Sequence, residues 1–468
     1  MTNQPTPALL WFRLDLRLSD NPALAASLAR GGAVLPVFIW APEEEGAWPP
    51  GAASRWWLHQ SLTALSLALE LRGSRLIVRR GPSARTLEAL ASETGAGAVF
   101  WNRRYEPAVI ERDAAVKTAL RARGLSAESF NGNLLHEPWT ILNAAGQPYR
   151  VFTPFWHACM KAPIPLASAV PPAVLPPVSQ PYSLPLADLE LEPAIDWAAG
   201  LREVWRPGEE GAREHLRRFQ GQDLSEYPLH RDRPDLTGTS RLSPHLHFGE
   251  ISPGDVLRAI MTNMQADPKA RESYRRQLVW REFAYHLLYH FPATAEQPMR
   301  SEFAKFPWRM QRSWFDAWKR GATGYPLADA GMRELWHTGW MHNRLRMVTA
   351  SFLVKHLLIS WQDGAKWFWD TLVDADLANN TFGWQWVAGC GADAAPYFRI
   401  FNPTLQAAKF DPDGAYVRHW IPEVESAAYP RPIVDRADAR AAALHAWEEL
   451  PSSPLPAAKA RHGKHEIV

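Results

Sequence analysis

The sequence predicts an α/β domain with a five-stranded parallel sheet and a large all-α domain, joined by a long Pro-rich connector. Three observations lead to this prediction. The first 130 residues alternate short apolar runs with helical segments, as in a parallel sheet wrapped by helices. Residues 162–193 then hold nine prolines. From about Glu203 onward, apolar residues recur with the 3.6-residue period of amphipathic helices.

Each expected strand is a short apolar run that suits burial on both faces of a sheet. Each intervening helical segment is followed by a break that contains glycine, which favours a helix C-terminus. The expected strands are Ala8–Phe12, Ala33–Trp40, Ser74–Arg79, Ala98–Trp101 and Ser126–Phe130, and the expected helices are Pro22–Ala29, Ser54–Arg72, Ser83–Thr94 and Ile110–Arg123. The region contains neither a GxGxxG dinucleotide motif nor a Walker A loop.

The predicted domains are residues 1–130 (α/β), 131–200 (connector), 201–435 (all-α) and 436–468 (a helix and a basic tail). We expect the Pro-dense part of the connector, residues 162–193, to be a surface linker lying over the body, because dense proline is incompatible with a regular helix or a central strand. The helices expected in the all-α domain are Ala212–Phe219, Pro253–Met264, Glu272–Tyr289, Ser313–Lys319, Ala328–Leu335, Met341–Leu358 and Ala365–Leu372.

Composition excludes several classes of protein. Two cysteines, Cys159 and Cys390, cannot build a disulfide framework or a Cys-based metal site. No apolar run is long enough to span a membrane, and the N-terminus lacks a secretory pattern, so a cytoplasmic location is expected. The net charge of +2 means that nucleic-acid binding would need a local basic patch. The 23 tryptophans indicate either a Trp-rich core or roles in cofactor handling, base stacking or electron transfer.

Two stretches combine groups that suit anions and bases. The loop Thr237–Ser243 joins a glycine, hydroxyl groups and Arg241 ahead of a helical segment, which fits either phosphate binding or an ordinary helix N-cap. Gln277, Trp280 and Arg281 share one face of a predicted helix. An amide, a flat ring and a cation suit a base and its phosphate, and a simply solvated amphipathic helix is the alternative.

Two later stretches, Gly339–Met347 and Asp374–Trp386, place polar residues among apolar ones. Arg346 and Asp374 would form a buried ion pair if the fold brings them together, because an unpaired buried polar group costs stability. His286 and His290 have i, i+4 spacing but lack a carboxylate to complete a metal site. We therefore expect a packing or surface role for both histidines and no metal site.

Taken together, these stretches resemble the DNA photolyase/cryptochrome flavoprotein family. The matching segments follow in the family's order and cover nearly the whole chain: Trp11–Asn21, Gly238–Ser243, Trp280–Phe283, Gly324–Pro326, Gly339–Arg344, Gly383–Trp386 and Asp393–Pro403. The resemblance implies an N-terminal antenna domain and an α-helical domain that binds FAD in a folded form. It also implies that Trp101–Pro107, at the strand ends where ligands gather, is the candidate region for a second chromophore, a folate, a deazaflavin or another flavin, unless that site is empty.

The resemblance implies light-driven repair of ultraviolet-damaged DNA by a monomeric protein that is nucleoid-associated when bound. In the family's reaction, photoexcited FADH⁻ gives one electron to a cyclobutane pyrimidine dimer, the ring splits, and the electron returns. The lesion must leave the base stack to reach the flavin. A non-repairing blue-light photoreceptor is the alternative from another class, although the short tail after about residue 433 is unlike the long extension of many signalling cryptochromes.

The family's FAD contacts carry over to matching positions. The phosphates would be held by Tyr227, Thr239, Ser240, Arg241, Leu242 and Ser243. Arg346 and Asp374 would pair beside the flavin ring, Asp376 would accept a hydrogen bond from it, and Asn380 would face N5. Trp384, Trp361 and Trp308 match the family's electron-hopping chain, which would serve photoreduction of oxidised flavin and not repair by FADH⁻ itself.

The lesion contacts carry over in the same way. Trp280 and Trp386 would flank the flipped lesion, Gln277, Asn343 and Met347 would contact its edges, and Arg281 and Arg344 would bind nearby phosphate.

One of these positions bears on the lesion type. Many cyclobutane-dimer photolyases have Glu where this chain has Gln277, and Gln occurs there in (6-4) photolyases. The (6-4) enzymes, however, place two acid–base histidines where Asn343 and Met347 stand. The missing histidines outweigh the Gln, so cyclobutane-dimer repair is the leading hypothesis and (6-4) repair is an alternative.

Overall fold

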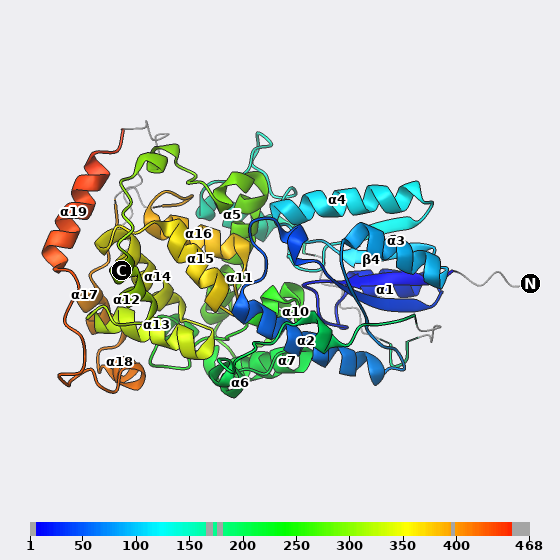
Figure 1. The fold of residues 1–468 in the computed structure, drawn as a ribbon, viewed down its shortest axis with the longest axis horizontal. Helices are drawn as coiled ribbons and strands as arrows, with labels where there is room; N and C mark the ends of the chain where they lie inside the picture. The colour runs from blue at the N-terminus through cyan, green and yellow to red at the C-terminus, as the bar shows by residue number, and fades with distance from the viewer. Residues whose placement is uncertain (1–5, 165–171, 176–180, 395–397, 452–468) are drawn as a thin grey trace, which may run out of the picture.

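The structure is a computed structural model that describes residues 6–164, 172–175, 181–394 and 398–451. Four connector prolines (Pro165, Pro171, Pro176 and Pro177) and the predicted basic tail after residue 451 lie outside the described residues. Figure 1 shows the α/β domain at one end of the molecule and the helical body at the other. The predicted fold class is therefore confirmed.

A parallel sheet with the order β3-β2-β1-β4-β5 forms the N-terminal domain. Its strands are β1 (Ala8–Phe12), β2 (Val34–Trp40), β3 (Ile77–Arg80), β4 (Ala98–Asn102) and β5 (Ser126–Phe130). The helices between them are α1 (Pro22–Ala29), α2 (Ala52–Glu70), α3 (Ser83–Thr94) and α4 (Pro107–Ala122). All nine elements were predicted, with ends that differ by at most three residues.

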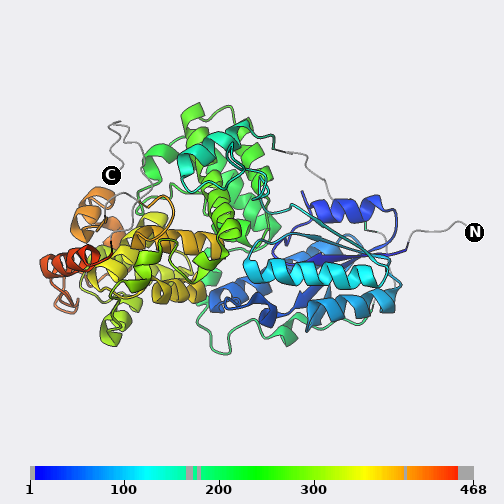
Figure 2. The ribbon, with the colours of Figure 1, turned by 90° about the horizontal axis from the view of Figure 1, so that it is seen from above.

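Side chains of successive strand residues point to opposite faces of this sheet. Leu10 and Phe12 of β1 pack in one core with Leu24 of α1 and Trp57 of α2. Leu9 and Trp11, which alternate with Leu10 and Phe12 along β1, point the other way, into a core built with α3 and α4. The sheet is thus wound on both faces, and Figure 2 shows its helices from above. The strand order reverses between β1 and β4, which is the topological switch point.

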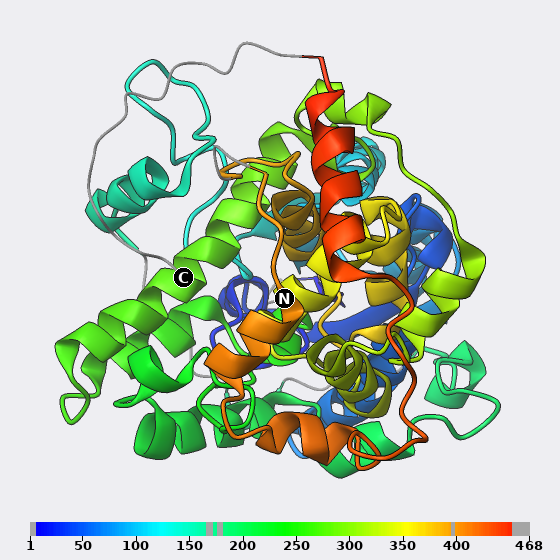
Figure 3. The same ribbon diagram turned by 90° about the vertical axis from the view of Figure 1, so that its left-hand side faces the viewer.

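The all-α part is a body of packed helices, which Figure 3 shows end-on. Its helices are α6 (Ala199–Val204), α7 (Glu209–Arg218), α8 (Tyr227–His230), α9 (Ser243–His247), α10 (Pro253–Thr262), α11 (Pro268–His290), α12 (Arg312–Lys319), α13 (Pro326–Thr338), α14 (Asn343–Ser351), α15 (Trp361–Thr371), α16 (Leu377–Ala388), α17 (Pro403–Phe410), α18 (Ala415–Trp420) and α19 (Arg436–Glu448). Helix α16 was not among the predicted helices. The predicted helix Met341–Leu358 is instead α14 followed by a π-helical turn, Phe352–His356. No helix in the described ranges has the length and apolar character needed to cross a bilayer.

The connector is more structured than a surface linker. It contains a helix, α5 (Phe152–Lys161), whose Phe152, Phe155, Trp156 and Cys159 are buried against α11. Further along, Leu175, Leu189 and Leu191 are buried in the core of the α/β domain. Helix α5 was not predicted, although its buried residues have the i, i+3, i+4 and i+7 spacing of an apolar helix face ahead of the proline run.

The two domains share a hydrophobic core. Trp57 of α2 donates a hydrogen bond from Nε1 to Glu250 Oε1 at 3.0 Å, and Trp205 packs edge-on against Trp57 with ring centroids 5.3 Å apart. Trp340, which precedes α14, belongs to the same core as Trp56 and Trp57. Burial of this much aromatic surface fixes the helical body relative to the sheet.

Close packing of α15 on α16 depends on Gly364. A Cβ atom at this position would lie 2.2 Å from Trp384 Cη2 and 2.7 Å from Leu353 Cδ2. We expect Gly364→Ala to lower the free energy of unfolding by about 1–3 kcal/mol, as overpacking does in other cores. Chemical denaturation checks this value. The matched control is Gly383→Ala on α16, where no atom lies within 4 Å of the added Cβ and alanine should leave stability unchanged or raised. Equal stability of the two variants would contradict the packing argument.

Candidate functional site

The loop that precedes α9 places a cation without a counter-charge beside several hydroxyl groups. Arg241 has φ +51, a left-handed conformation that is rare outside glycine and that clusters at functional sites. Within the described residues its guanidinium makes no hydrogen bond or ion pair. Burial lowers the pKa of Arg241, although the charge of Glu334 opposes this. A half-buried arginine in this state fits an anionic ligand.

The neighbours of Arg241 are held by aromatic residues. Tyr274 of α11 donates a hydrogen bond to Ser240 Oγ at 2.8 Å, and the ring of Tyr227 meets that of Tyr274 edge-on at 5.3 Å. Leu242 is buried in the same core. Thr239 is half-buried and Ser243 is exposed at the start of α9. The structure thus gathers all six residues predicted to contact phosphate.

Trp340 connects this loop to the second predicted part of the site. Its Nε1 donates to Ser243 Oγ at 3.1 Å. The guanidinium carbons of Arg241 and Arg346 lie 4.9 Å and 5.9 Å from the centre of its ring. Cation–π contacts of this kind place both arginines next to one aromatic surface.

The predicted ion pair between Arg346 and Asp374 is present. Arg346 Nη2 donates to the two Asp374 carboxylate oxygens at 2.7 and 3.0 Å, and its Nε donates to Met341 O at 2.8 Å. The Asp374 side chain is 3% exposed and that of Arg346 is 25% exposed. The pair gives a buried carboxylate a cationic partner and leaves part of the guanidinium accessible.

Asp376 is the second buried carboxylate of the site. It caps α16 by accepting from the Asn379 N–H at 2.8 Å, and the Tyr285 hydroxyl donates to it. His247 Nδ1 lies 3.6 Å from its carboxylate. Burial alone would raise the pKa of Asp376, but His247, Arg281 and Tyr285 together lower it well below its ordinary value. The carboxylate therefore stays ionised and able to accept hydrogen bonds.

Asn380 lies one turn into α16, and its Nδ2 donates to Ala365 O of α15 at 3.0 Å. Two tryptophans of the predicted hopping chain, Trp384 and Trp361, are 2% and 1% exposed. The third, Trp308, is partly buried and packs against the same core. The structure therefore puts one tryptophan nearer the surface than the other two; their role in electron transfer stays a prediction.

Gln277 and Trp280 lie one turn apart on α11, and both are partly exposed. Within the described residues the Gln277 carboxamide has no hydrogen-bond partner, so its donors and acceptor are free. On α16, Trp386 is also partly exposed, and its Nε1 donates to Asp393 O at 3.2 Å. Helices α11 and α16 pack directly against each other.

Asn343 and Met347 share one face of α14. Asn343 is exposed, and its Nδ2 lies 3.9 Å from Met347 Sδ. The adjacent His342 is 3% exposed, and its Nδ1 accepts from the Arg344 N–H at 3.1 Å. Burial lowers the pKa of His342 to about 4. This histidine is therefore a neutral helix cap.

Two arginines predicted to contact phosphate have internal partners. Arg281 donates to Asn133 O at 2.8 Å, and Arg344 pairs with Asp232 at 2.9 Å while lying 4.2 Å over the Phe410 ring. Both side chains are 11% exposed. Burial and hydrogen bonding thus give both guanidiniums a role in holding the fold, and their contact with DNA phosphate stays a prediction.

Glu282, beside Arg281, was not predicted. It is 3% exposed, and its Oε2 accepts from the His136 N–H of the connector at 3.0 Å. Its Oε1 is buried with no hydrogen-bond partner, 3.7 Å from Arg281 Nη1. Burial raises the pKa of Glu282 to about 7, although Arg281 and the backbone N–H groups of His136 and Leu135 oppose the rise.

The candidate antenna stretch Trp101–Pro107 is tied into ion pairs. Arg103 pairs with Glu137, and Arg104 pairs with Glu45 through two 2.7 Å hydrogen bonds. Arg13 at the end of β1 makes 2.8 and 2.6 Å hydrogen bonds to the Asp113 carboxylate. A second chromophore at this edge of the sheet stays a prediction.

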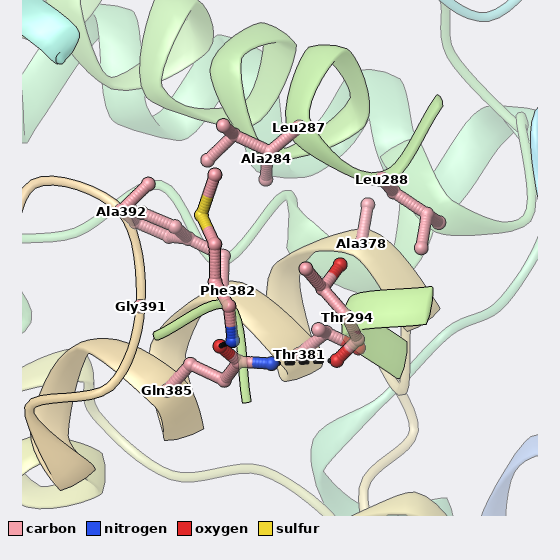
Figure 4. A pocket seen from close by; sticks show the side chains of 11 residues that line it. Ala284, Leu287, Leu288, Thr294, Ala378, Thr381, Phe382, Gln385, Gly391 and Ala392 are labelled. Carbon is pink, nitrogen blue, oxygen red and sulfur yellow. Dashed lines mark hydrogen bonds between the residues drawn. The ribbon is translucent and has the colours of Figure 1, made fainter. Parts of the chain in front are cut away.

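Two cavities lie away from the predicted cofactor residues. One, of about 20 Å³, sits between α11 and α16 (Figure 4), where Gln385 binds the Thr294 carbonyl at 2.6 Å. It holds about one water molecule. The other, of about 330 Å³, lies at the junction of the domains and is lined by paired charges such as Arg213 with Glu209. Neither has an unpaired group that would specify a ligand.

His286 and His290 take part in packing, as predicted. One ring nitrogen of each lies 3.1 Å from Pro138 O, and His286 Nε2 accepts from the Tyr149 N–H at 3.0 Å. Both histidines therefore hold the connector against α11.

Sequence reasoning missed Trp340, Tyr285 and His247. Trp340 stood inside a quoted motif, and Tyr285 lies one turn after Arg281 on α11, so both could have been noticed. His247 gave no signal, because its partner Asp376 is more than one hundred residues away.

The protein has a sheet domain joined to a helical body. The helical body holds an arginine without an ion-pair partner among the described residues, an Arg–Asp pair and an ionised buried carboxylate. This combination fits a two-domain protein that binds an anionic cofactor. Comparison with known families makes this specific. Residues 8–175 match the family described as DNA photolyase, and residues 274–428 match the FAD binding domain of DNA photolyase.

Individual relatives agree. The chain is 48% identical to a deoxyribodipyrimidine photo-lyase of Agrobacterium fabrum, over 96% of this chain and 98% of that protein. It is 40% identical to cryptochrome-1 of Arabidopsis thaliana, over 89% of this chain and 63% of that protein. The crystal structure of a class III photolyase from Agrobacterium tumefaciens superposes with a TM-score of 0.93 at 47% identity, covering 96% of this chain and 98% of that one.

The chain belongs to the DNA photolyase/cryptochrome family. It carries the family's FAD-binding domain, and it is an enzyme of the photolyase type that acts in light-dependent DNA repair. The resemblance inferred from the seven motifs is confirmed.

The buried Glu282 makes stability depend on pH. Its folded-state pKa of about 7 lies above the ordinary value, so folding favours the neutral carboxyl. The stability that the neutral Glu282 carboxyl contributes is present at low pH and is lost as pH rises through about 7. We expect the free energy of unfolding of the wild type to fall by roughly 1–3 kcal/mol from pH 5 to pH 8, relative to Glu282→Gln. Denaturation of the FAD-bound protein at both pH values measures this. Glu272→Gln, at an exposed position on the same helix, is the control and should show the pH dependence of the wild type. If the free energies of unfolding of the wild type and of Glu282→Gln change equally with pH, Glu282 does not titrate in this range.

Proposed function

We propose that the protein repairs cyclobutane pyrimidine dimers in DNA by light-driven electron transfer to a flipped-out lesion. The observation that carries this proposal is the set of groups on α11 and α14. Gln277 presents a carboxamide without an internal partner, Trp280 is partly exposed one turn away, and Asn343 and Met347 offer no acid or base.

The absence of an acid–base pair on α14 separates the two lesion types. Repair of a (6-4) lesion needs groups that move protons. The histidine next to these positions, His342, is buried, and its Nδ1 is already used by the Arg344 N–H. A cyclobutane dimer needs only an electron donor, apolar walls and hydrogen bonds to its carbonyl groups, which this surface provides.

FAD fits the residues that surround Arg241. A diphosphate would supply the counter-charge that this arginine lacks, with the hydroxyls of Thr239, Ser240 and Ser243 as additional donors. The Arg346–Asp374 pair would lie beside the flavin, Asp376 would accept a hydrogen bond from it, and Asn380 would offer an amide to N5. When bound in reduced form, FAD supplies the light-excited electron that opens the cyclobutane ring, and it recovers the electron afterwards.

The two tryptophans of this surface, Trp280 and Trp386, would contact the lesion and not the cofactor. Trp280 and Trp386 would stack against the flipped pyrimidines, because a π-face accepts any base. Gln277 would hydrogen-bond to the pyrimidine edge. The protein would therefore bind a damaged site by replacing the stacking that the lesion loses when it leaves the duplex.

Loss of Arg241 tests the cofactor assignment. We expect Arg241→Ala to weaken FAD binding roughly 10- to 100-fold, because charge-assisted hydrogen bonds to the diphosphate disappear. Flavin-stripped protein titrated with FAD and followed by flavin fluorescence gives the dissociation constant. Arg217→Ala, at an exposed position on α7, should bind FAD as the wild type does. Unchanged affinity in Arg241→Ala would remove this residue from the site.

The function itself is tested with oligothymidine that contains cyclobutane dimers. Reduced holoprotein should restore the thymine absorbance in blue light and not in darkness. Trp280→Ala should weaken binding to the damaged strand by about 1–3 kcal/mol, the usual cost of a lost stacking partner.

Two outcomes would contradict the proposal. Recovery only with (6-4) lesions would reassign the substrate. No recovery with either lesion, from protein that binds and photoreduces its flavin, would indicate a photoreceptor.

A further inference from the structure

Helix α5 of the connector reaches the proposed lesion-binding surface. Its first residue, Phe152, is fully buried, and its ring stacks on Trp280 of α11 with centroids 3.4 Å apart and planes 7° from parallel. Phe152 lies 128 residues before Trp280 in the chain. A helix of the connector therefore covers one face of a tryptophan that carries the proposed function.

The near-complete overlap of the two rings is imposed by their surroundings. Isolated aromatic rings prefer an offset or an edge-on arrangement. Phe283 meets Trp280 edge-on at 5.9 Å and Phe152 edge-on at 5.8 Å. The guanidinium of Arg276 lies 4.9 Å from the Phe152 ring, and a cation over one ring reduces the electrostatic repulsion between the stacked faces. This packing holds the Trp280 indole in one orientation.

The first turn of α5 also lies close to Trp386, the second tryptophan proposed to flank the lesion. Burial raises the pKa of the Asp393 carboxyl to about 6, although the nearby backbone N–H of Phe152 and the charge of Arg276 oppose the rise. The backbone carbonyl of Asp393 accepts from Trp386 Nε1 at 3.2 Å. Asp393 has φ +53, so this loop holds a strained conformation where it joins α5 to Trp386.

We propose that Phe152 is a positioning residue for lesion recognition: it occupies one face of Trp280, fixes the plane of the indole, and leaves the rest of the ring for the flipped pyrimidine. The inference rests on the proposed function of Trp280. Phe152 itself does not touch the lesion, so its whole effect on lesion binding passes through Trp280.

A double-mutant cycle tests this statement. The quantity measured is the ratio of affinities for a dimer-containing oligonucleotide and an undamaged oligonucleotide of the same sequence, with FAD-bound protein in darkness. We expect Phe152→Leu to lower this ratio about three- to tenfold, the range of one lost aromatic pair. In the Trp280→Ala background, the same substitution should cause no further loss. Phe152→Met, which also removes the ring and keeps most of the volume, serves if the leucine variant does not fold.

Phe155→Leu is the matched control. Phe155 lies on the same helix and is also buried, but its ring packs against Phe283 and His286, with centroids 5.2 and 4.9 Å apart, and not against Trp280. It should lose stability and keep the affinity ratio.

The outcomes distinguish a failure of the proposed function from a failure of the positioning role of Phe152. A wild type that does not prefer damaged DNA, or a Trp280→Ala variant with an unchanged ratio, overturns the proposed function of this surface. A wild-type ratio in Phe152→Leu, an equal loss in both backgrounds, or an equal loss in Phe155→Leu overturns the positioning role alone.

Discussion

The placement of Trp340 is the constraint on which the site depends. Its indole is buried in the core that the α/β domain shares with the helical body, so it cannot move without separating the two domains. Its Nε1 holds Ser243, and its ring receives the guanidiniums of Arg241 and Arg346. The cationic loop and the Arg–Asp pair are therefore positioned against one rigid surface. An anionic cofactor would meet pre-oriented donors, which reduces the entropy lost on binding.

Regular elements were predictable because their signals are local. The apolar runs that form the buried strands are visible in the sequence, and all five strands were predicted from them. Helix α16 was missed because its buried and polar residues do not follow one stripe. Helix α5 was missed because the proline run beside it dominated the interpretation. The contacts of His247 with Asp376 and of Phe152 with Trp280 depend on tertiary folding, which no local pattern encodes.

Burial determines which charged side chains of the candidate site are paired within the fold. Arg281 and Arg344 carried the right charge for DNA phosphate at the right places in the motifs. In the fold both guanidiniums also meet internal acceptors, Asn133 O and Asp232, because a buried guanidinium without partners is costly. Arg241 is the contrasting case, since it is partly buried and has no hydrogen-bond or ion-pair partner among the described residues. Motif matching selects candidate residues, and the hydrogen bonds of the fold show which of their groups are already engaged.

The surface proposed to bind the lesion depends in the same way on apolar groups that the fold holds in place. Flipping a damaged pair out of a duplex costs a few kcal/mol, and a stacking surface repays this cost only if it is already oriented. Trp280 has little freedom, because Phe152 covers one face and Phe283 contacts its edge. Gln277, one turn away, can then approach the pyrimidine edge from a fixed direction. A glutamine cannot donate a proton to the lesion as a glutamic acid can, so geometry must supply more of the recognition here. The connector helix that holds Trp280 is, on this argument, part of the recognition machinery and not only a link between domains.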